Sequence, residues 1–297
     1  MTLELAQVLK AWSSPVFATF DGAKFDDLPK LVAQADITVR SLFLGQDDPR
    51  AIKAGPWFAS LGERSLSSLL GVDGISVAAV FWRGGCNMEA AFHHFRTLNL
   101  VDVPRPKNAP ADPFAADPET VLFRHWDPSV MGLVLPLFDP GQRSRLFGPM
   151  EALAIYDGGS DGVRVAKRRP DWPPPPQGRL CLSTAQLDGI TTGLSQRMNR
   201  KIANYLRTTA PERLSGTDES TLLQDVDLSM KTGRAMGLES ERALGQWAWL
   251  MLVSGRTILS NKDAVVTITT GIGTPDERIG RLLLGIGGAI YNREIGR

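Results

Sequence analysis

The sequence has few of the residues that most often carry chemistry or cross-link small folds. Its 297 residues include two cysteines, Cys86 and Cys181, and three histidines, His93, His94 and His125. Two cysteines so far apart do not form a disulfide framework, and they suit a reducing compartment. On a predicted helix the neighbours His93 and His94 would point about 100° apart, so they are poorly placed to share one metal ion. We therefore expect surface or partly buried histidines, with no catalytic site, metal or cofactor.

Long apolar runs, a charge imbalance and several enzyme motifs are also missing. The longest apolar stretch, Trp247 to Val253, is far shorter than the ~20 residues of a membrane-spanning helix. The N-terminus carries Glu4 and no basic region, which is unlike a signal peptide. The 33 basic and 32 acidic residues give a net charge of +1, from which neither nucleic-acid nor membrane-surface binding follows. No His-Glu-x-x-His or Cys-x-x-Cys motif occurs. These absences predict a cytoplasmic protein with no nucleic-acid or membrane partner.

The first half of the chain alternates between strand-like and helix-like segments. The run Ile75 to Trp82 is almost continuously apolar, which predicts a central strand covered on both faces. Asp127-Pro128 predicts a helix start, because Asp accepts bonds from free N–H groups and Pro suits the first helical position. Strands are predicted at 16–20, 37–44, 57–61, 75–82, 98–103 and 121–126, with a hairpin made of 151–156 and 163–167.

A proline-rich segment separates this half from a helical one. Four consecutive prolines between Arg168 and Gly178 form neither a helix nor a central strand. Beyond them, apolar residues recur every three or four positions and predict helices at 187–205, 222–230, 243–252 and from Thr274 onward. The sequence thus predicts an α/β (α+β) N-terminal domain with a mixed sheet at 1–168, a linker at 169–178 and an all-helical lobe at 179–297.

Four residues near predicted strand ends are candidate site residues. Asp21 and Asp127 follow strands, where α/β proteins place functional groups. Local chemistry offers the alternative that Asp21 shapes a turn and Asp127 caps a helix, and we favour it. Arg124 and Trp126 share one face of the predicted strand. Two interpretations stay open for Arg124: an ion pair with a buried carboxylate, or a contact with a partner.

A basic stripe follows the first helix after the linker. It comprises Arg197, Arg200, Lys201 and Arg207. The stripe would suit an acidic partner or a nucleic acid, but a solvated helix face is the commoner meaning, and no aromatic residues interleave with it. Arg197 and Lys201 are its candidate partner contacts.

Five short motifs occur in a fixed order along the chain. They are Phe17-Ala-Thr-Phe-Asp-Gly-Ala23, Ser41-Leu-Phe-Leu-Gly45, Ala54-Gly-Pro-Trp57, Phe123-Arg-His-Trp-Asp-Pro128 and Phe147-Gly-Pro149. The ordered set resembles the adaptor/chaperone proteins of bacterial type VI secretion. The helical half, with Ala235-Met-Gly-Leu238 before an aromatic-rich helix, is similar to that family's more variable C-terminal lobe. Two features depart from the family pattern: the proline-rich loop 104–118, and His125 where a large apolar or aromatic residue is commoner.

The resemblance implies a non-enzymatic, cytoplasmic protein. Such adaptors bind a toxic effector protein before secretion and help to load it onto the spike (VgrG) protein or its tip. The effector is then expected to contact the helical lobe and the cleft between the lobes. Two other functions remain open. One is a hydrolase-like enzyme with a site at the sheet ends, made of Asp21, His125 and Asp127; the other is nucleic-acid binding through the basic stripe.

Overall fold

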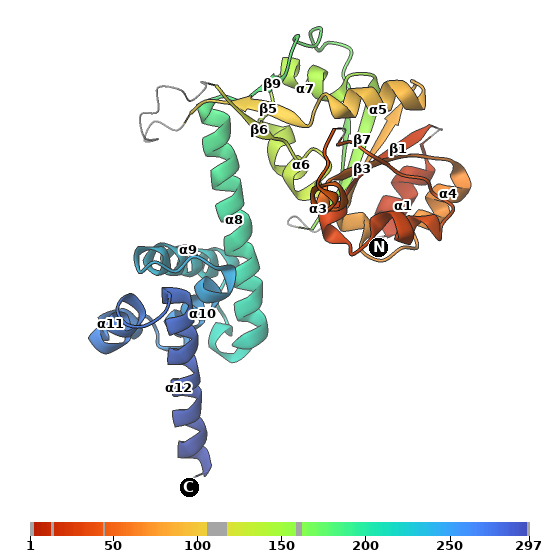
Figure 1. Ribbon diagram of the computed structural model, residues 1–297. Coiled ribbons are helices and arrows are strands. Elements are labelled where there is room, and N and C mark those ends of the chain that lie inside the picture. Colours follow the sequence, from red (N-terminus) through yellow and green to blue (C-terminus); the bar gives the residue numbers. More distant parts are fainter. Residues whose placement is uncertain (1–2, 13–14, 44, 106–117, 159–161, 296–297) are drawn as a thin grey trace. The chain divides into compact units, whose positions relative to one another are not determined.

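The chain divides into two compact units, Met1–Thr192 and Gly193–Arg297, which are described separately. The computed structural model describes residues 3–12, 15–43, 45–105, 118–158 and 162–295, with side chains to residue 285 (Figure 1). The division lies within helix α8 (Thr184–Thr209), further along the chain than the linker predicted at 169–178. Most of the loop predicted at 104–118 lies outside the described residues.

A six-stranded sheet forms the centre of the first unit. All of its neighbouring strands are antiparallel. A second sheet of three strands contains one parallel pair, β5 with β9, so the predicted mixed pairing is found there. In spatial order the large sheet is β2 (Arg40–Ser41), β3 (Pro56–Leu61), β1 (Val16–Asp21), β4 (Ala79–Gly84), β7 (Met150–Asp157) and β8 (Gly162–Lys167); the small one is β6 (Glu119–Leu122), β5 (Leu100–Val103) and β9 (Leu180–Cys181).

Helices cover both faces of the large sheet (Figure 1). Successive side chains of a strand point to opposite faces. In β1, Phe17 therefore joins a core with Trp82 and Phe95, whereas Ala18 and Phe20 join a second core on the other face. The first core is closed by α5 (Met88–Arg96), α6 (Pro128–Val134) and α7 (Pro140–Phe147); the second is closed by α1 (Leu3–Lys10), α2 (Leu28–Ala33) and α4 (Glu63–Leu69).

The second unit is helical, as predicted. Ile202 and Leu206 of α8 pack in one core with Val226 and Trp247, and the Trp247 indole donates to Thr232 Oγ1 at 2.9 Å. The predicted capping box is confirmed, because Thr274 and Glu277 exchange side-chain-to-backbone hydrogen bonds of 3.0 and 3.2 Å. The helices after α8 are α9 (Glu219–Ala235), α10 (Glu241–Val253), α11 (Lys262–Thr269) and α12 (Pro275–Ile295). No helix in the described part of the chain is both long and apolar enough to cross a membrane.

Three strand predictions are wrong in extent. Of 37–44 only Arg40–Ser41 is strand, and Ile75–Val77 is a 3-10 turn that precedes β4. The third, 121–126, matters most for the site. Strand β6 ends at Leu122, and the chain turns over 124–127, where the Asp127 N–H donates to the Arg124 carbonyl at 3.0 Å. Arg124 and Trp126 therefore do not follow strand alternation.

Candidate partner-binding site

Four of the five motifs meet at one end of β1, beginning with a close approach of two backbones. The N–H of Gly22 donates to the carbonyl of Gly55 at 3.1 Å. A Cβ on Gly22 would lie 2.3 Å from the Lys53 carbonyl oxygen and 2.9 Å from the Trp57 indole nitrogen. Contacts this short do not occur for a real Cβ, so only glycine fits here. The backbones of the first and third motifs are thus packed directly against each other.

Phe43, from the second motif, lies over this junction. A Cβ on Gly55 would lie 2.7 Å from the Phe43 ring, and the ring meets Trp126 edge-on with 6.0 Å between centroids. Trp126 is only 2% exposed. It was predicted as a partner contact, but the turn after β6 directs its side chain into the interior. We call the set Gly22, Phe43, Gly55, Trp126 and the Arg124 ion pairs the motif junction.

Arg124 holds two buried carboxylates together. Its Nη2 lies 2.5 Å from Asp21 Oδ2 and 3.1 Å from Asp127 Oδ2. The other carboxylate oxygens accept from backbone: Asp21 Oδ1 from the Ala23 N–H at 3.3 Å, and Asp127 Oδ1 from the Ser129 N–H at 2.8 Å. The predicted turn and helix cap are therefore confirmed, and so is an ion pair of Arg124 with a buried carboxylate.

The exposure of these three side chains is uneven. Asp21 and Asp127 are 1% and 7% exposed, whereas Arg124 is 42% exposed. Burying a carboxylate is costly unless it is paired and hydrogen-bonded, and each here has both kinds of contact. Close to half of the Arg124 side chain therefore remains exposed. Among the three charged side chains of the motif junction, Arg124 is the one that a partner can reach.

His125 is sealed inside the first unit. It is fully buried, stacks on Phe95 with 6.0 Å between centroids, and its Nε2 lies 3.1 Å from Asn99 Oδ1. Burial lowers the pKa of His125 to about 3, so the ring is neutral at physiological pH. Asp21 and Asp127 are occupied by Arg124, and His125 faces an amide. These three residues are not assembled as a hydrolytic site.

Sequence reasoning missed one hydrolase-like spacing. Gly158, Ser160 and Gly162 fit the pattern Gly-x-Ser-x-Gly. In hydrolases this pattern joins a strand to a helix. Here it joins β7 to the antiparallel strand β8, and residues 159–161 lie outside the described residues. The structural context that would support a catalytic serine is therefore missing.

The other two histidines, His93 and His94, differ in how far they are exposed. His93 is exposed, whereas His94 is mostly buried, with Nε2 2.9 Å from the Leu146 carbonyl oxygen. Burial lowers the pKa of His94 to about 4. Gly148 of the fifth motif packs against it with a φ of +50°, and a Cβ there would lie 2.2 Å from the ring. Within the described ranges, no three His, Cys, Asp or Glu side chains are arranged to hold a metal ion.

Two of the four cations in the basic stripe of α8 form ion pairs within the second unit. Lys201 Nζ lies 2.6 Å from Glu241 Oε1, and Arg207 pairs with Glu219. Arg197 also has a partner. A nucleic-acid site needs cations that are free to meet phosphates. Of the two predicted contacts, Lys201 is held in an ion pair that joins α8 to α10.

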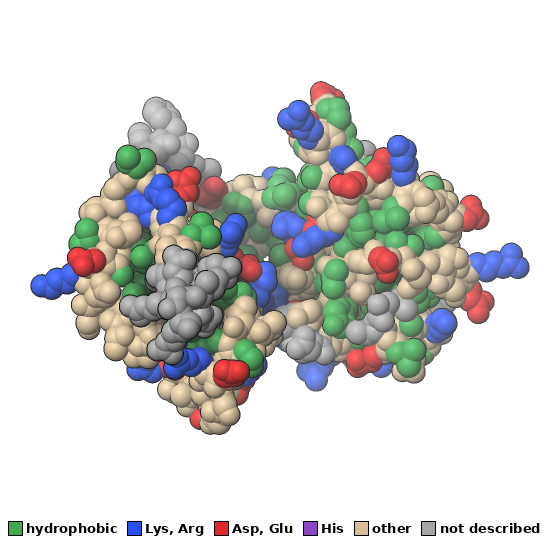
Figure 2. All heavy atoms as spheres, turned by 90° about the horizontal axis from the view of Figure 1, so that it is seen from below, with side chains coloured by type: hydrophobic (Ala, Val, Ile, Leu, Met, Phe, Trp, Pro, Cys, Tyr) green, Lys and Arg blue, Asp and Glu red, His purple; other side chains and the backbone are tan. Residues whose placement is uncertain are grey.

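Apolar side chains remain exposed on the second unit. Figure 2 shows exposed apolar side chains lying among charged ones on one face of the molecule. The most exposed on the second unit are Ile272 at 88%, Leu284 at 79%, Val266 at 55% and Leu194 at 54%. Large apolar side chains with this exposure are candidate contacts for a partner.

Comparison with known proteins gives one match. Residues 16–145 match the family model described as Domain of unknown function (DUF4123), over less than half of the chain. No curated protein and no solved structure matches the chain. The matched region contains the whole of the motif junction, from the end of β1 to the start of α6.

Proposed function

We propose that this protein is a cytoplasmic adaptor that binds an effector of a type VI secretion system and helps to load it onto the spike (VgrG) protein. The observation that carries the proposal is the family match over 16–145, which contains four of the five ordered motifs resembling that adaptor family. No similar protein of known function supports the proposal.

The geometry of the motif junction supports binding over catalysis. The groups that a hydrolase would use are engaged elsewhere, since Asp21 and Asp127 bind Arg124 and His125 faces Asn99. What the junction presents outward is the half-exposed Arg124 guanidinium. An exposed guanidinium with its geometry fixed by two carboxylates is well suited to contact a partner's carboxylate or carbonyl oxygens.

The helical unit supplies the apolar surface that an effector would need. An adaptor stabilises a client by covering apolar area that would otherwise cause aggregation. Ile272 and Leu284, both more than three-quarters exposed, have large side chains with little of their own unit to pack against. We place the apolar part of the effector contact on this unit.

Co-expression with the neighbouring open reading frames tests the proposal. We expect a neighbouring effector to co-purify with this protein, and to lose solubility or secretion when its gene is deleted. The paired substitution Ile272→Asp/Leu284→Asp should abolish co-purification, whereas Leu3→Asp, an equally exposed apolar position at 77%, should not. If no neighbour co-purifies and none changes solubility or secretion on deletion, the adaptor function is wrong.

A further inference from the structure

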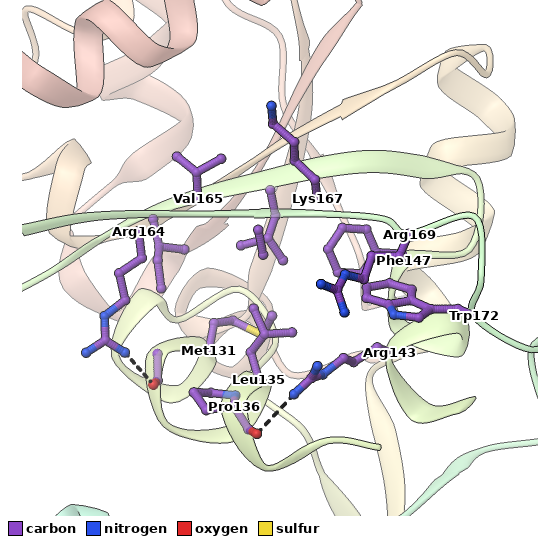
Figure 3. Close-up of a pocket in the computed structure, with 14 residues that line it drawn as sticks. Met131, Leu135, Pro136, Arg143, Phe147, Arg164, Val165, Lys167, Arg169 and Trp172 are labelled. Carbon is purple, nitrogen blue, oxygen red and sulfur yellow. Dashed lines mark hydrogen bonds between the residues drawn. The ribbon is translucent and has the colours of Figure 1, made fainter. Parts of the chain in front are cut away.

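An apolar pocket of about 490 Å³ lies in the first unit beside the edge of the large sheet (Figure 3). Its floor is made by Phe147 of α7, Leu153 and Ile155 of β7, and Trp172 of the proline-rich segment. Its opposite wall comes from α6 and the 3-10 turn Leu135–Leu137. The Trp172 ring meets Phe147 edge-on at 5.2 Å, so the proline-rich segment is packed onto this unit and completes the pocket.

Basic residues line the pocket, and none of the described residues that line it is acidic. The basic ones are Arg143, Arg164, Lys167 and Arg169, of which Lys167 directs its side chain to the opposite face of β8, away from the pocket (Figure 3). Arg164 lies 3.5 Å from buried Asp157, but the other three have no carboxylate partner among the described residues. Arg143 donates to the Pro136 carbonyl at 3.1 Å, and its Nε is buried without a partner. The pocket therefore combines an apolar interior with a positive rim, on which Arg143 and Arg169 have no carboxylate partner among the described residues.

Strand β8 borders the pocket and is the last strand of its sheet. Arg168 N–H donates to the Glu151 carbonyl at 2.8 Å, which sets the hydrogen-bonded pairs of the β7–β8 ladder. Antiparallel ladders alternate, so the backbone groups of Val163, Val165 and Lys167 point away from β7. These N–H and C=O groups form an open edge of the kind that accepts an added strand.

We infer that an extended acidic segment of the partner adds to β8 as a further strand and places a large apolar side chain in the adjacent pocket. This inference rests on the proposed adaptor function and names the chemistry of the partner segment. Backbone hydrogen bonds to the β8 edge supply alignment, and the pocket selects an aromatic or long aliphatic residue. Because successive side chains of a strand point to opposite faces, the carboxylates next to that residue lie on the face of β8 that carries Lys167.

A second copy of this chain fits the edge poorly. Strand β8 reads Gly-Val-Arg-Val-Ala-Lys and carries two cations and no acidic residue. Pairing it with itself would bring Arg164 and Lys167 of two copies close together, and like charges across a strand pair are destabilising. Charge complementarity thus favours an acidic segment from a different protein.

Peptide binding to the full chain tests the inference directly. The probe is a nine-residue fluorescent peptide in which valine and phenylalanine alternate with aspartate and glutamate; a matched peptide has lysine at every acidic position. We expect saturable anisotropy changes with the acidic peptide only, weakened by added salt. Equal binding of both peptides, or no binding of the acidic peptide, would overturn the inference.

Three variants locate the binding. Lys167→Glu/Arg169→Glu, both exposed, should raise the Kd by about tenfold, since two attractions become repulsions. Lys24→Glu/Lys53→Glu makes the same charge change elsewhere on this unit and should leave the Kd within about twofold. Val165→Pro removes one outward N–H, which an edge strand tolerates, and should weaken binding more than Val165→Ala. Unchanged affinity for both Lys167→Glu/Arg169→Glu and Val165→Pro refutes the site.

The same variants separate this inference from the adaptor function. If the neighbouring effector co-purifies equally with the wild-type chain and Lys167→Glu/Arg169→Glu, the adaptor function stands and the β8 site is wrong. If the acidic peptide binds as expected but no effector co-purifies, the site stands and the adaptor function fails. If Val165→Pro turns a dimer into a monomer in sedimentation, the edge joins two copies and the inference of a different partner is overturned.

Discussion

Replacement of Arg124 by methionine should destabilise the first unit more than substitutions of half-exposed side chains usually do. Methionine keeps most of the length of the side chain but none of its charge. Asp21 and Asp127, 1% and 7% exposed, would then lose the cation that each contacts. Removing one partner of a buried charge is much more costly than removing the whole group, because the remaining charge stays unsolvated.

The magnitude follows from the two contacts. Arg124 donates a hydrogen bond to Asp21 and forms an ion pair with Asp127. A contact of this charge-assisted kind contributes about 1.5–3 kcal/mol, so the two sum to about 3–6 kcal/mol. Because 42% of the Arg124 side chain is exposed, water replaces part of each contact, and we halve the sum to about 1.5–3 kcal/mol. For a unit of this size, 1 kcal/mol lowers the Tm by roughly 2–4 °C, so Arg124→Met should lower it by about 3–12 °C.

Urea unfolding and differential scanning calorimetry of the full chain measure the effect. Arg50→Met, an exposed arginine with no ion pair among the described residues, is the control for lost charge and should change stability by less than about 0.5 kcal/mol. Adding Asp21→Asn and Asp127→Asn to Arg124→Met should recover most of the loss, because no buried charge then remains. Equal stability of Arg124→Met and the control, or no recovery by the two amides, would refute this account of the ion pairs.

Three further predictions concern buried polar and strained positions. Burial lowers the pKa of His94 to about 4 and the pKa of His125 to about 3, against about 6.5 in the unfolded chain. The stability that the two neutral rings contribute is therefore complete above pH 6.5 and is lost as the pH drops. Urea titrations should show a loss of about 2 kcal/mol per histidine at pH 5. Gly148→Ala should lower the Tm of the first unit by several degrees, because φ is +50° and the new Cβ would meet the His94 ring. Arg278 is 8% exposed and donates to the Ile268 carbonyl at 2.7 Å, so Arg278→Met should expose the backbone amides joining α11 and α12 to faster hydrogen exchange.

Each of these has a control in the same unit. His93→Gln changes an exposed histidine, so the variant should lose as much stability at low pH as the wild-type chain does. A smaller loss of stability in this variant would contradict the explanation by burial. Gly158→Ala should be better tolerated than Gly148→Ala, because the nearest described atom to its added Cβ is a Tyr156 ring atom at 4.0 Å. Exposed Arg242→Met should leave exchange between α11 and α12 unchanged; equal exchange in both arginine variants would show that the Arg278 contacts are dispensable.

Local chemistry made much of the fold predictable. The Asp127-Pro128 and Thr274-Pro275 helix starts, the hairpin of β7 and β8 and the helical second half depend on neighbouring residues, and all are present. Helix α11 was missed because 262–269 is rich in Val, Ile and Thr, which favour strands locally. The burial of Ala264 and Ile268 against the rest of the unit decides its conformation.

The candidate site was less predictable, because its contacts span long separations in the chain. Asp21 and Arg124 are 103 positions apart, and nothing near either residue indicates the other. The inward position of Trp126 depends on the turn over 124–127. The sequence there is apolar and aromatic, which predicts a strand instead of a turn. The positive pocket was hidden for the same reason, since it gathers side chains from α6, α7, β7, β8 and Trp172.

The separation of Asp21 from Arg124 has a consequence for synthesis of the chain. At 5–20 residues per second, Arg124 leaves the ribosome about 5 to 20 s after Asp21. Strand β1 can pair with β3 and β4 during that interval, but the Asp21 carboxylate has no cation to bury beside and must keep its water. The Asp21 end of the central strand can therefore close only after the fourth motif has been synthesised.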